Sequence, residues 1–339
     1  MKLKNILITG GCGYFGNSLM RKLIYNGYNV KCLDLLIYGE ESIKSLSNNK
    51  NFTLIHGDIR DEKKVNESLK NIDAVVHLAA IVGDKPCEAA PAAAYDINFN
   101  GTRKLYQLSL KNKISRFIFA STCSNYGISS DTLANENSKL NPVSLYAESK
   151  IDCENFLESQ AKTNTKAISL RFGTAYGISQ RTRFDLTVNS FGYEAYKLKK
   201  ISVFAENTWR PYIHVDDMSN IVLEILGKDN IKNNFEKYNA GFTKENFTKR
   251  QIVEKLVYLL PSLEVEYIPY DNDRRNYKVD FSKIEKFLNL KNQYSVIDGF
   301  REILSALETK QLDDNSYLNF NLEALTRFFQ KNSKKLIYK

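Results

Sequence analysis

The chain has few of the residues that build metal centres and disulfide frameworks. Its 339 residues include three widely separated histidines: His56, His77 and His214. The five cysteines are odd in number and form no CxxC pair: Cys12, Cys32, Cys87, Cys123 and Cys153. Zinc sites and disulfide scaffolds need ligands at short, regular spacings. We therefore expect no metal and no disulfide, and we expect most thiols to be small buried side chains.

Long apolar runs are also missing. No stretch approaches the roughly 18 uninterrupted apolar residues that a membrane helix needs. The N-terminus leads directly into "KNILITGG", without the charged region, apolar core and cleavage site of a secretory signal. We therefore expect a cytoplasmic protein with no membrane partner. An apolar content of 43% is sufficient for a sizeable core.

Acidic residues are fewer than basic ones, and the net charge is +9. Clustered lysines and arginines bind nucleic-acid phosphates. Here the lysines are spread among asparagines along the whole chain, and only "KNSKKLIYK" at the C-terminus concentrates them. We interpret the charge as solvated and expect no nucleic-acid partner.

The first half alternates short β-branched or aromatic runs with segments of helical periodicity. The runs "KNILITG", "YNVKCLD", "FTLIHGD", "DAVVHLA", "RFIFAST" and "KAISLRF" predict strands. Helices are expected over 14–26, 61–70, 95–112 and 145–162. This alternation predicts an α/β fold, a doubly wound parallel (Rossmann) sheet, with ligands outside the carboxyl ends of its strands.

The alternation loosens after residue 174 and predicts a smaller α/β lobe interleaved with the first. We expect the larger domain over 1–173 and 212–230, and the substrate lobe over 174–211 and 231–308. A tail follows over 309–339, with one amphipathic helix. Its apolar stripe should dock on its own chain: Leu322, Leu325, Phe328 and Phe329.

The stretch "TGGCGYFG" places Gly10, Gly13 and Gly16 between the first strand and a helix. Glycines let the backbone approach a pyrophosphate, and the helix N-terminus offers it free N–H groups. Asp34 closes the second strand, where a carboxylate holds adenosine ribose hydroxyls. Because an acid would repel a 2′-phosphate, we predict NAD and not NADP as the cofactor.

The third strand ends in "HGDIRD". Asp58 and Ile59 of this stretch are expected to meet the adenine. An equally simple interpretation of Asp58 is a cap at the start of the next helix.

Four motifs follow one another along the chain: the GxxGxxG spacing, "HLAA" at 77–80, "INFNGT" at 97–102 and "YAESK" at 146–150. Together they resemble the extended short-chain dehydrogenase/reductase family, which modifies nucleotide-linked sugars, over residues 3 to 308. The resemblance implies an NAD-dependent enzyme acting on a nucleoside-diphosphate sugar. It also implies cofactor contacts from Tyr14, Phe15, Leu78, Ala79, Ala80 and Asn98.

Tyr146 and Lys150 lie four residues apart on a predicted helix and share one face. A free tyrosine has a pKa of about 10, and near-neutral titration requires a preference of about 4 kcal/mol for the phenolate. A nearby ammonium and a positive nicotinamide have the right sign of charge. We predict Tyr146 as the general base. The resemblance implies that Lys150 also binds the nicotinamide ribose and that the Thr122 hydroxyl contacts the reacting oxygen.

The stretch "STCSNYG" at 121–127 restricts the chemistry. Family members that dehydrate the sugar carry an Asp-Glu pair after the threonine, where this chain has Cys123 and Ser124. A 4,6-dehydratase is therefore disfavoured. Oxidation at C4, inversion at C4 and reduction of a 4-keto sugar stay open. GDP-fucose synthase, a C3/C5 epimerase-reductase, has a cysteine at the position of Ser124, so Cys123 is either a displaced acid/base or a packed thiol.

Substrate contacts are expected from several stretches, including Cys123 and Ser124 of the loop at 121–127. Val82 and Gly83 follow the fourth strand and should line the sugar pocket, and Thr174 stands where many relatives have an asparagine. The resemblance assigns the nucleotide to four residues: Arg181, Arg183, Asn189 and Arg210. Arg274 or its neighbour Arg275 is expected to add a second phosphate contact, since guanidinium forks suit diphosphates. For each arginine other than Arg210, a surface salt bridge is an equal alternative. His214 is expected to be structural.

The pattern "RTRFDLTVNSF", then "WRPYIHV" and "RRNY", resembles bacterial sugar-nucleotide 4-dehydrogenases and 4-epimerases of surface-polysaccharide pathways, including enzymes for GDP-heptose. A non-catalytic NAD-binding regulator is the alternative from another class. Helices at 95–112 and 143–162 lie where relatives form an intermolecular four-helix bundle. We therefore expect a homodimer, unless the tail covers those faces.

Overall fold

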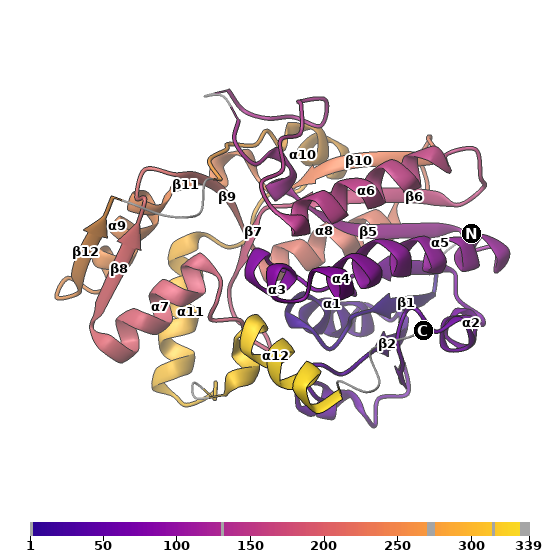
Figure 1. Cartoon of the computed structure of the whole chain (residues 1–339), viewed down its shortest axis with the longest axis horizontal. Coiled ribbons are helices and arrows are strands. Elements are labelled where there is room, and N and C mark those ends of the chain that lie inside the picture. Colours follow the sequence, from indigo (N-terminus) through magenta and orange to yellow (C-terminus); the bar gives the residue numbers. More distant parts are fainter. Residues whose placement is uncertain (1–2, 130–131, 270–274, 314–315, 333–339) are drawn as a thin grey trace.

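The computed structural model describes residues 3–129, 132–269, 275–313 and 316–332. In these ranges the main sheet has seven parallel strands (Figure 1). Their spatial order is β10 (Phe235–Ala240), β6 (Lys166–Phe172), β5 (Arg116–Thr122), β4 (Ala74–His77), β1 (Asn5–Thr9), β2 (Asn29–Asp34) and β3 (Phe52–His56). The predicted doubly wound parallel sheet is confirmed.

Alternating side chains of the strands pack against helices on opposite faces. On β1, Ile6 and Ile8 belong to one buried cluster and Leu7 to the other, as the two-residue period of a strand requires. The first cluster is covered by α1 (Tyr14–Tyr25), α8 (Val215–Gly227) and α10 (Ser282–Leu288). The second is covered by α2 (Glu62–Leu69), α5 (Thr102–Lys111) and α6 (Leu145–Ser159).

Short helical elements complete this domain. They are η1 (Glu41–Leu46), α3 (Asp84–Ala89), α4 (Pro91–Tyr95), the π-helical η2 (Asp96–Gly101) and η3 (Cys123–Tyr126). The helix expected over 95–112 is therefore the end of a longer helical run that begins at Pro91, a residue favoured in the first turn because it needs no N–H partner.

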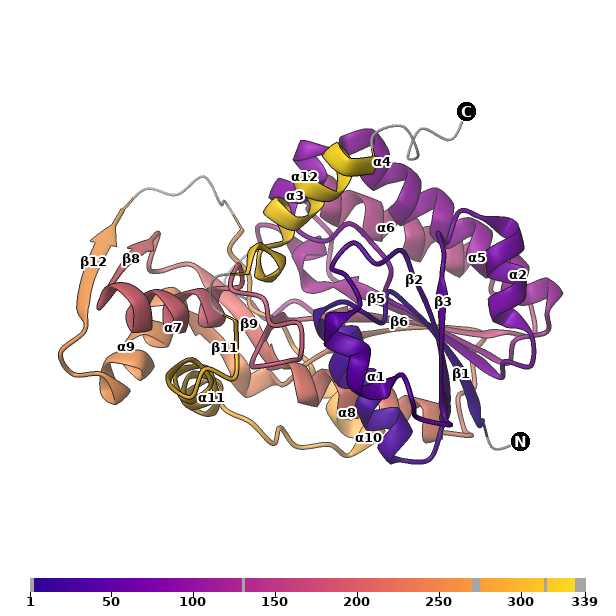
Figure 2. The same ribbon diagram turned by 90° about the horizontal axis from the view of Figure 1, so that it is seen from below.

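The second lobe is smaller and has its own buried cluster. Its strands are β7 (Thr174–Tyr176), β9 (Trp209–His214) and β11 (Asn246–Thr248) in one sheet, and β8 (Lys200–Phe204) and β12 (Glu264–Ile268) in a parallel pair. Its helices are α7 (Thr187–Leu198), η4 (Thr243–Glu245), α9 (Lys249–Leu259) and α11 (Val296–Glu308). Figure 2 shows this lobe beside one end of the main sheet.

The structure differs from the expected division at residues 231–308. β10 pairs with β6 along its whole length and is an edge strand of the main sheet. α10 packs against β10 and α8, so it also belongs to the larger domain. The sequence pattern alone did not separate these segments from the lobe, because a strand and a helix of ordinary length occur on both sides of the boundary.

Two further expectations concern local packing. His214 caps α8 by accepting from the backbone N–H of Asp216, and its ring stacks on Tyr294 with centroids 4.1 Å apart. It is structural, as expected.

The tail forms η5 (Tyr317–Asn319) and α12 (Asn321–Asn332), and Leu325 of α12 is buried in the second cluster. The tail therefore docks on its own chain.

Candidate active site

A cavity of about 300 Å³ opens at the carboxyl ends of the parallel strands, between the two lobes. Segments that follow β1, β2, β3, β4, β5 and β6 all contribute to its wall, together with residues of the smaller lobe and Asn321 of α12. This is the position at which a doubly wound sheet binds its ligands.

The glycine loop, residues 10–16, forms the floor of one end of the cavity. Gly10 has a φ of +74°, and a Cβ there would lie 2.7 Å from the backbone of Ala79. At Gly16 a Cβ would lie 2.5 Å from the Cα of Gly11. Gly13 precedes α1 without any side-chain cap, so the first N–H groups of that helix stay available near the cavity. Tyr14, Phe15, Leu78, Ala79 and Ala80 line the same end, and the cradle fits a pyrophosphate.

Asp34 is held at the end of β2 by two backbone N–H groups. Its Oδ2 accepts from Cys12 at 2.8 Å and its Oδ1 accepts from Leu36 at 2.7 Å. Burial raises the pKa of this carboxyl group. Each carboxylate oxygen can accept a further hydrogen bond, and Asp34 lines the cavity, so the group is suited to a ribose diol.

Asp58 and Ile59 also line this end of the cavity. Asp58 forms an ion pair with Arg60 at 2.7 Å, and the helix cap on α2 is Asp61 instead. Asp58 is therefore not the cap that sequence reasoning offered as an alternative.

Arg181 lies in a position that the sequence did not indicate. Its guanidinium stacks on the ring of Tyr38, 3.7 Å from the centroid, and both residues line the cavity. Its Nε and Nη2 have no hydrogen-bond partner among the described residues, and burial lowers its pKa to about 10. Tyr38 follows Asp34 by one loop, so Arg181 faces the end of the cavity near the glycine loop and Asp34 rather than the sugar end.

Tyr146 and Lys150 lie on α6, which begins after the N-cap Ser144. The Nζ of Lys150 donates to the carbonyl of Ala120 at 2.9 Å and lies 5.8 Å from the centroid of the Tyr146 ring. Thr122 ends β5, and its Oγ1 accepts from the N–H of Ser124. All three side chains line the cavity. The strand end and the helix therefore bring together the three predicted catalytic residues.

The electrostatics differ from the expectation in one respect. Burial raises the pKa of the Tyr146 phenol and lowers the pKa of Lys150. The protein by itself thus favours the neutral phenol. A positive charge from a bound ligand would favour the phenolate, which is the form that accepts a proton.

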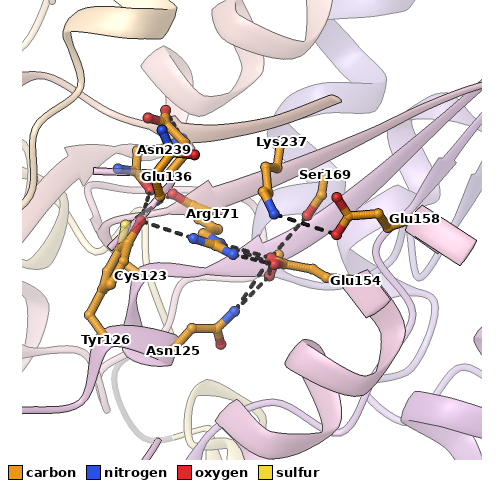
Figure 3. A network of polar contacts seen from close by, with 12 residues as sticks. Cys123, Asn125, Tyr126, Glu136, Glu154, Glu158, Ser169, Arg171, Lys237 and Asn239 are labelled. Carbon is orange, nitrogen blue, oxygen red and sulfur yellow. Dashed lines mark hydrogen bonds and ion pairs between the residues drawn. The ribbon is translucent and has the colours of Figure 1, made fainter. Parts of the chain in front are cut away.

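A buried polar network lies behind the loop at 121–127 (Figure 3). Glu154 of α6 and Arg171 of β6 form an ion pair at 2.6 Å, and Ser121, Asn125 and Ser169 donate to the same carboxylate. Arg171 also donates to the hydroxyl of Tyr126, which in turn donates to Asn239. The network fixes the loop that carries Thr122.

Cys123 belongs to this network and not to the cavity wall. Its thiol donates to the carbonyl of Arg171 at 3.0 Å and is buried. Burial raises its pKa well above the ordinary value. The structure favours the packed thiol over the displaced acid/base, because the thiol is bonded to the Arg171 carbonyl and Cys123 is not among the residues that line the cavity. The predicted substrate contact of Cys123 stays a prediction.

Two asparagines are also structural. Asn98 accepts from the N–H of Ile81 at 2.8 Å and donates to its carbonyl, so it stabilises the wall from behind. Asn189 accepts from Gly177 N–H and donates to the carbonyls of Gly177 and Arg183. Neither side chain lines the cavity. The backbone uses their amide groups, which supports a structural role, and their predicted ligand contacts stay predictions.

The other end of the cavity is lined by most of the predicted substrate residues: Val82, Gly83, Ser124, Thr174 and Arg183. An adjoining hollow of about 1360 Å³ shares several of them and contains Arg210, Lys249 and Arg275. Arg275 forms an ion pair with Asp84 at 3.0 Å. Arg274 lies outside the described residues.

Sequence reasoning missed Tyr38, Tyr277 and Asn321. Tyr277 lies 3.4 Å from Ser124, hydroxyl to hydroxyl, on the cavity wall. It stands in the stretch "RRNY", which had drawn attention only for its arginines. Asn321 comes from the tail, and no pattern in the sequence signals its place.

The similarity of this chain to known sequences agrees with this geometry. The model of the NAD dependent epimerase/dehydratase family matches residues 6–241. UDP-glucose 4-epimerase of Rhizobium meliloti is 32% identical over 180 residues, which cover 52% of this chain and 53% of that protein. Human dTDP-D-glucose 4,6-dehydratase is 26% identical over 287 residues, 80% of this chain and 79% of that protein.

A solved structure agrees as well. UDP-glucose 4-epimerase from Thermotoga maritima, determined with UDP-glucose, superimposes with a TM-score of 0.79 at 27% identity, covering 91% of this chain and all of that one. In the described residues no helix is both long and apolar enough to cross a bilayer. The glycine cradle, the three residues predicted to be catalytic and these matches identify the chain as an enzyme that belongs to the NAD-dependent epimerase/dehydratase family.

Proposed function

We propose that this enzyme oxidises C4 of a nucleoside-diphosphate sugar, either as a 4-dehydrogenase or as a 4-epimerase that passes through a 4-keto intermediate. The observation that carries the proposal is the convergence of Thr122, Tyr146 and Lys150 on one cavity wall, with no carboxylate on the loop beside them. A role in bacterial surface-polysaccharide synthesis is part of the proposal and rests on resemblance.

The proposed cofactor residues fit the group. The N–H groups at the start of α1 and the close-packed glycine loop would hold the pyrophosphate, and Asp34 would hold the adenosine ribose. Arg181, stacked on Tyr38, would neutralise a phosphate charge. NAD⁺ supplies a hydride acceptor and a positive ring when bound.

In the proposed reaction Tyr146 removes the proton of the C4 hydroxyl while the C4 hydride leaves. The Thr122 hydroxyl donates to the same oxygen and orients it. Lys150 keeps its ammonium beside the phenol through its bond to Ala120. The buried phenol must first lose its own proton to serve as this base, and the positive ring of bound NAD⁺ would favour that loss.

Dehydration is disfavoured by the position of the side chains on the loop. Loss of water from C5 and C6 needs an acid and a base in addition to the tyrosine. The Cys123 thiol is turned toward the Arg171 carbonyl, and Ser124 carries a hydroxyl that does not ionise near neutral pH. The carboxylates that line the cavity among the described residues are Asp34 and Asp58, at the proposed adenosine end.

A nucleotide sugar is supported by the guanidinium groups that border the adjoining hollow, since such groups suit a diphosphate. Arg183, Arg210 and Arg275 lie there, and the carboxylates of Asp185 and Asp84 pair with the first and the last of them. The Thermotoga maritima relative is described with UDP-glucose. The reduction of a 4-keto sugar is the reverse of the same step and uses the same residues.

The test is incubation of the purified enzyme and NAD⁺ with UDP-, GDP- and dTDP-sugars, followed by proton NMR. An inverted C4 centre indicates an epimerase, and an accumulating ketone with NADH indicates a dehydrogenase. Tyr146→Phe should lower the rate by about 10²–10⁴-fold, which is the contribution of proton transfer in such sites. Tyr258→Phe, on the exposed side of α9, is the matched control. Unchanged turnover in Tyr146→Phe would contradict the proposed mechanism.

We also propose a homodimer. Tyr95 at the end of α4 and Leu145 at the start of α6 are 48% and 45% exposed. Exposed large apolar side chains on two helices that pack against each other favour a protein contact. Light scattering should give about twice the chain mass of 38.9 kDa, and a stable monomer would contradict this proposal.

A further inference from the structure

The C-terminal segment, residues 316–332, connects the two lobes across the active-site cavity. Its first part is held by the smaller lobe. Asn319 accepts from the backbone N–H of Phe184 at 3.0 Å. The ring of Phe320 packs beside Phe184 and Tyr193, with centroids 6.2 and 6.1 Å away.

The second part is held by the larger domain. Ala324 and Leu325 of α12 are 1% and 3% exposed, and Leu325 joins the buried cluster beneath α5 and α6. α12 packs against α3, which follows the segment 79–83 of the cavity wall, and Figure 2 shows the two helices side by side. The C-terminal segment is therefore fixed at both ends.

Asn321 lies between these anchors and lines the cavity. It is 3% exposed. Its backbone N–H donates to Asp185 at 3.2 Å, and its Nδ2 donates to the carbonyl of Val82 at 3.2 Å. Because a carbonyl oxygen can only accept, the amide atom that faces Val82 is Nδ2, and Oδ1 is the remaining atom.

The Oδ1 of Asn321 has no hydrogen-bond partner among the described residues. A buried acceptor without a donor costs about 1–3 kcal/mol. The atom therefore needs a donor, and the cavity beside it is the place from which a donor can come. Val82, whose carbonyl accepts from Asn321, and the next residue Gly83 are wall residues assigned to the sugar. The carboxylate that holds the Asn321 backbone is paired with Arg183.

We propose that Asn321 is a specificity-determining residue whose Oδ1 accepts a hydrogen bond from a hydroxyl of the glycosyl group. The inference rests on the proposed function and deepens it. The C-terminal segment then acts as a wall of the sugar site. Its residues Phe320, Leu322, Glu323 and Thr326 border the adjoining hollow as well, so they limit the space for groups attached to the sugar.

Calorimetric titration of the NAD-loaded, full-length protein tests this proposal without turnover. The probes are UDP-glucose, GDP-mannose and dTDP-glucose, each paired with its nucleoside diphosphate. One of these nucleotide sugars should bind wild type. Asn321→Ala should lower the affinity for that sugar about tenfold, corresponding to about 1.4 kcal/mol. The nucleoside diphosphate should bind as before. Gln330→Ala removes a carboxamide from an exposed position of the same helix and serves as the matched control.

Deoxy analogues separate a direct contact from a structural effect. A nucleotide sugar that lacks the contacted hydroxyl should bind wild type about tenfold more weakly, and Asn321→Ala should add no further loss, because partners in one bond are not additive. Asn321→Ser, with a smaller acceptor, should recover part of the affinity if Asn321→Ala folds poorly. The contact would be overturned if Asn321→Ala lost equal affinity for the nucleotide sugar and for the nucleoside diphosphate. It would also be overturned if the losses of affinity were additive for every deoxy analogue. Either result leaves the proposed function intact. A wild-type protein that binds none of the nucleotide sugars would refute both.

Discussion

The carboxylate of Glu154 lies 2.6 Å from the guanidinium of Arg171, and the two side chains are only 4% and 2% exposed. Glu154 is one helical turn beyond Lys150 on α6, and Arg171 belongs to β6. The pair therefore connects the catalytic helix to the sheet directly behind the loop of Thr122. Three neutral donors satisfy the same carboxylate, so the charge is buried without an unpaired oxygen.

Removing the charge of Glu154 should destabilise the fold. Glu154→Gln leaves the Arg171 cation buried without its partner, and breaking a buried pair costs about 3–5 kcal/mol. Glu158→Gln, one turn further along α6, removes a half-exposed pair with Lys237 at 3.4 Å and should cost less than about 1 kcal/mol. Urea denaturation measures both. Equal urea midpoints for the two variants would show that the buried pair stabilises the fold no more than the half-exposed pair does.

Asp34→Ser should change the choice of cofactor. The variant loses the acceptors proposed for the adenosine ribose and removes the charge that repels a 2′-phosphate. We expect NAD⁺ to bind about tenfold more weakly and NADP⁺ to bind more tightly than to wild type. Fluorescence titration with both dinucleotides gives the ratio. A variant that keeps the wild-type preference would indicate that Asp34 only stabilises the glycine loop.

The free energy of unfolding should depend on pH through Glu245, a residue remote from the cavity. Burial raises the pKa of this carboxyl group to about 7, from 4.5. The native state thus holds a proton that the unfolded state has released, and stability falls as the pH rises from about 4.5 to above 7. Glu245→Gln removes this loss. The stability of the variant relative to wild type should rise by about 2 kcal/mol between pH 5 and pH 8 in urea titrations. A difference that does not change with pH would contradict the raised pKa.

The five thiols should be slow to react in the native protein. All are buried, and burial raises the pKa of Cys87, Cys123 and Cys153. The sulfurs of Cys12 and Cys32 lie 4.0 Å apart, about twice the length of a disulfide bond of roughly 2 Å, and both thiols are free. Treatment with Ellman's reagent should titrate five thiols in denaturant and fewer than one within minutes in buffer. Rapid native labelling would show that the loop opens.

Sequence patterns predicted the strands and the residues that follow them, because the rules for parallel sheets place strand ends at one edge. Gly10, Asp34, Thr122 and Tyr146 are all found there. Motifs specify proximity, however, and not the direction of a side chain. Asn98, Cys123 and Asn189 lie close to the cavity, yet backbone groups behind its wall use their polar atoms.

Contacts between distant parts of the chain were not predictable. Asn321 meets Val82 across 239 residues, and only the docking of α12 creates this neighbourhood. Arg181 and Tyr38 also stack only because tertiary packing brings together two loops of different lobes. Neither pair leaves a local periodicity that the sequence could show.

The position of β10 at the edge of the main sheet has a consequence for synthesis of the chain. β6 leaves the ribosome with one row of backbone N–H and C=O groups unpaired, and this edge stays open until residues 235–240 have been translated. A nascent chain that stalls between these strands exposes a template for pairing with other chains. Chaperone demand during translation should therefore peak before β10 emerges and fall once it has docked.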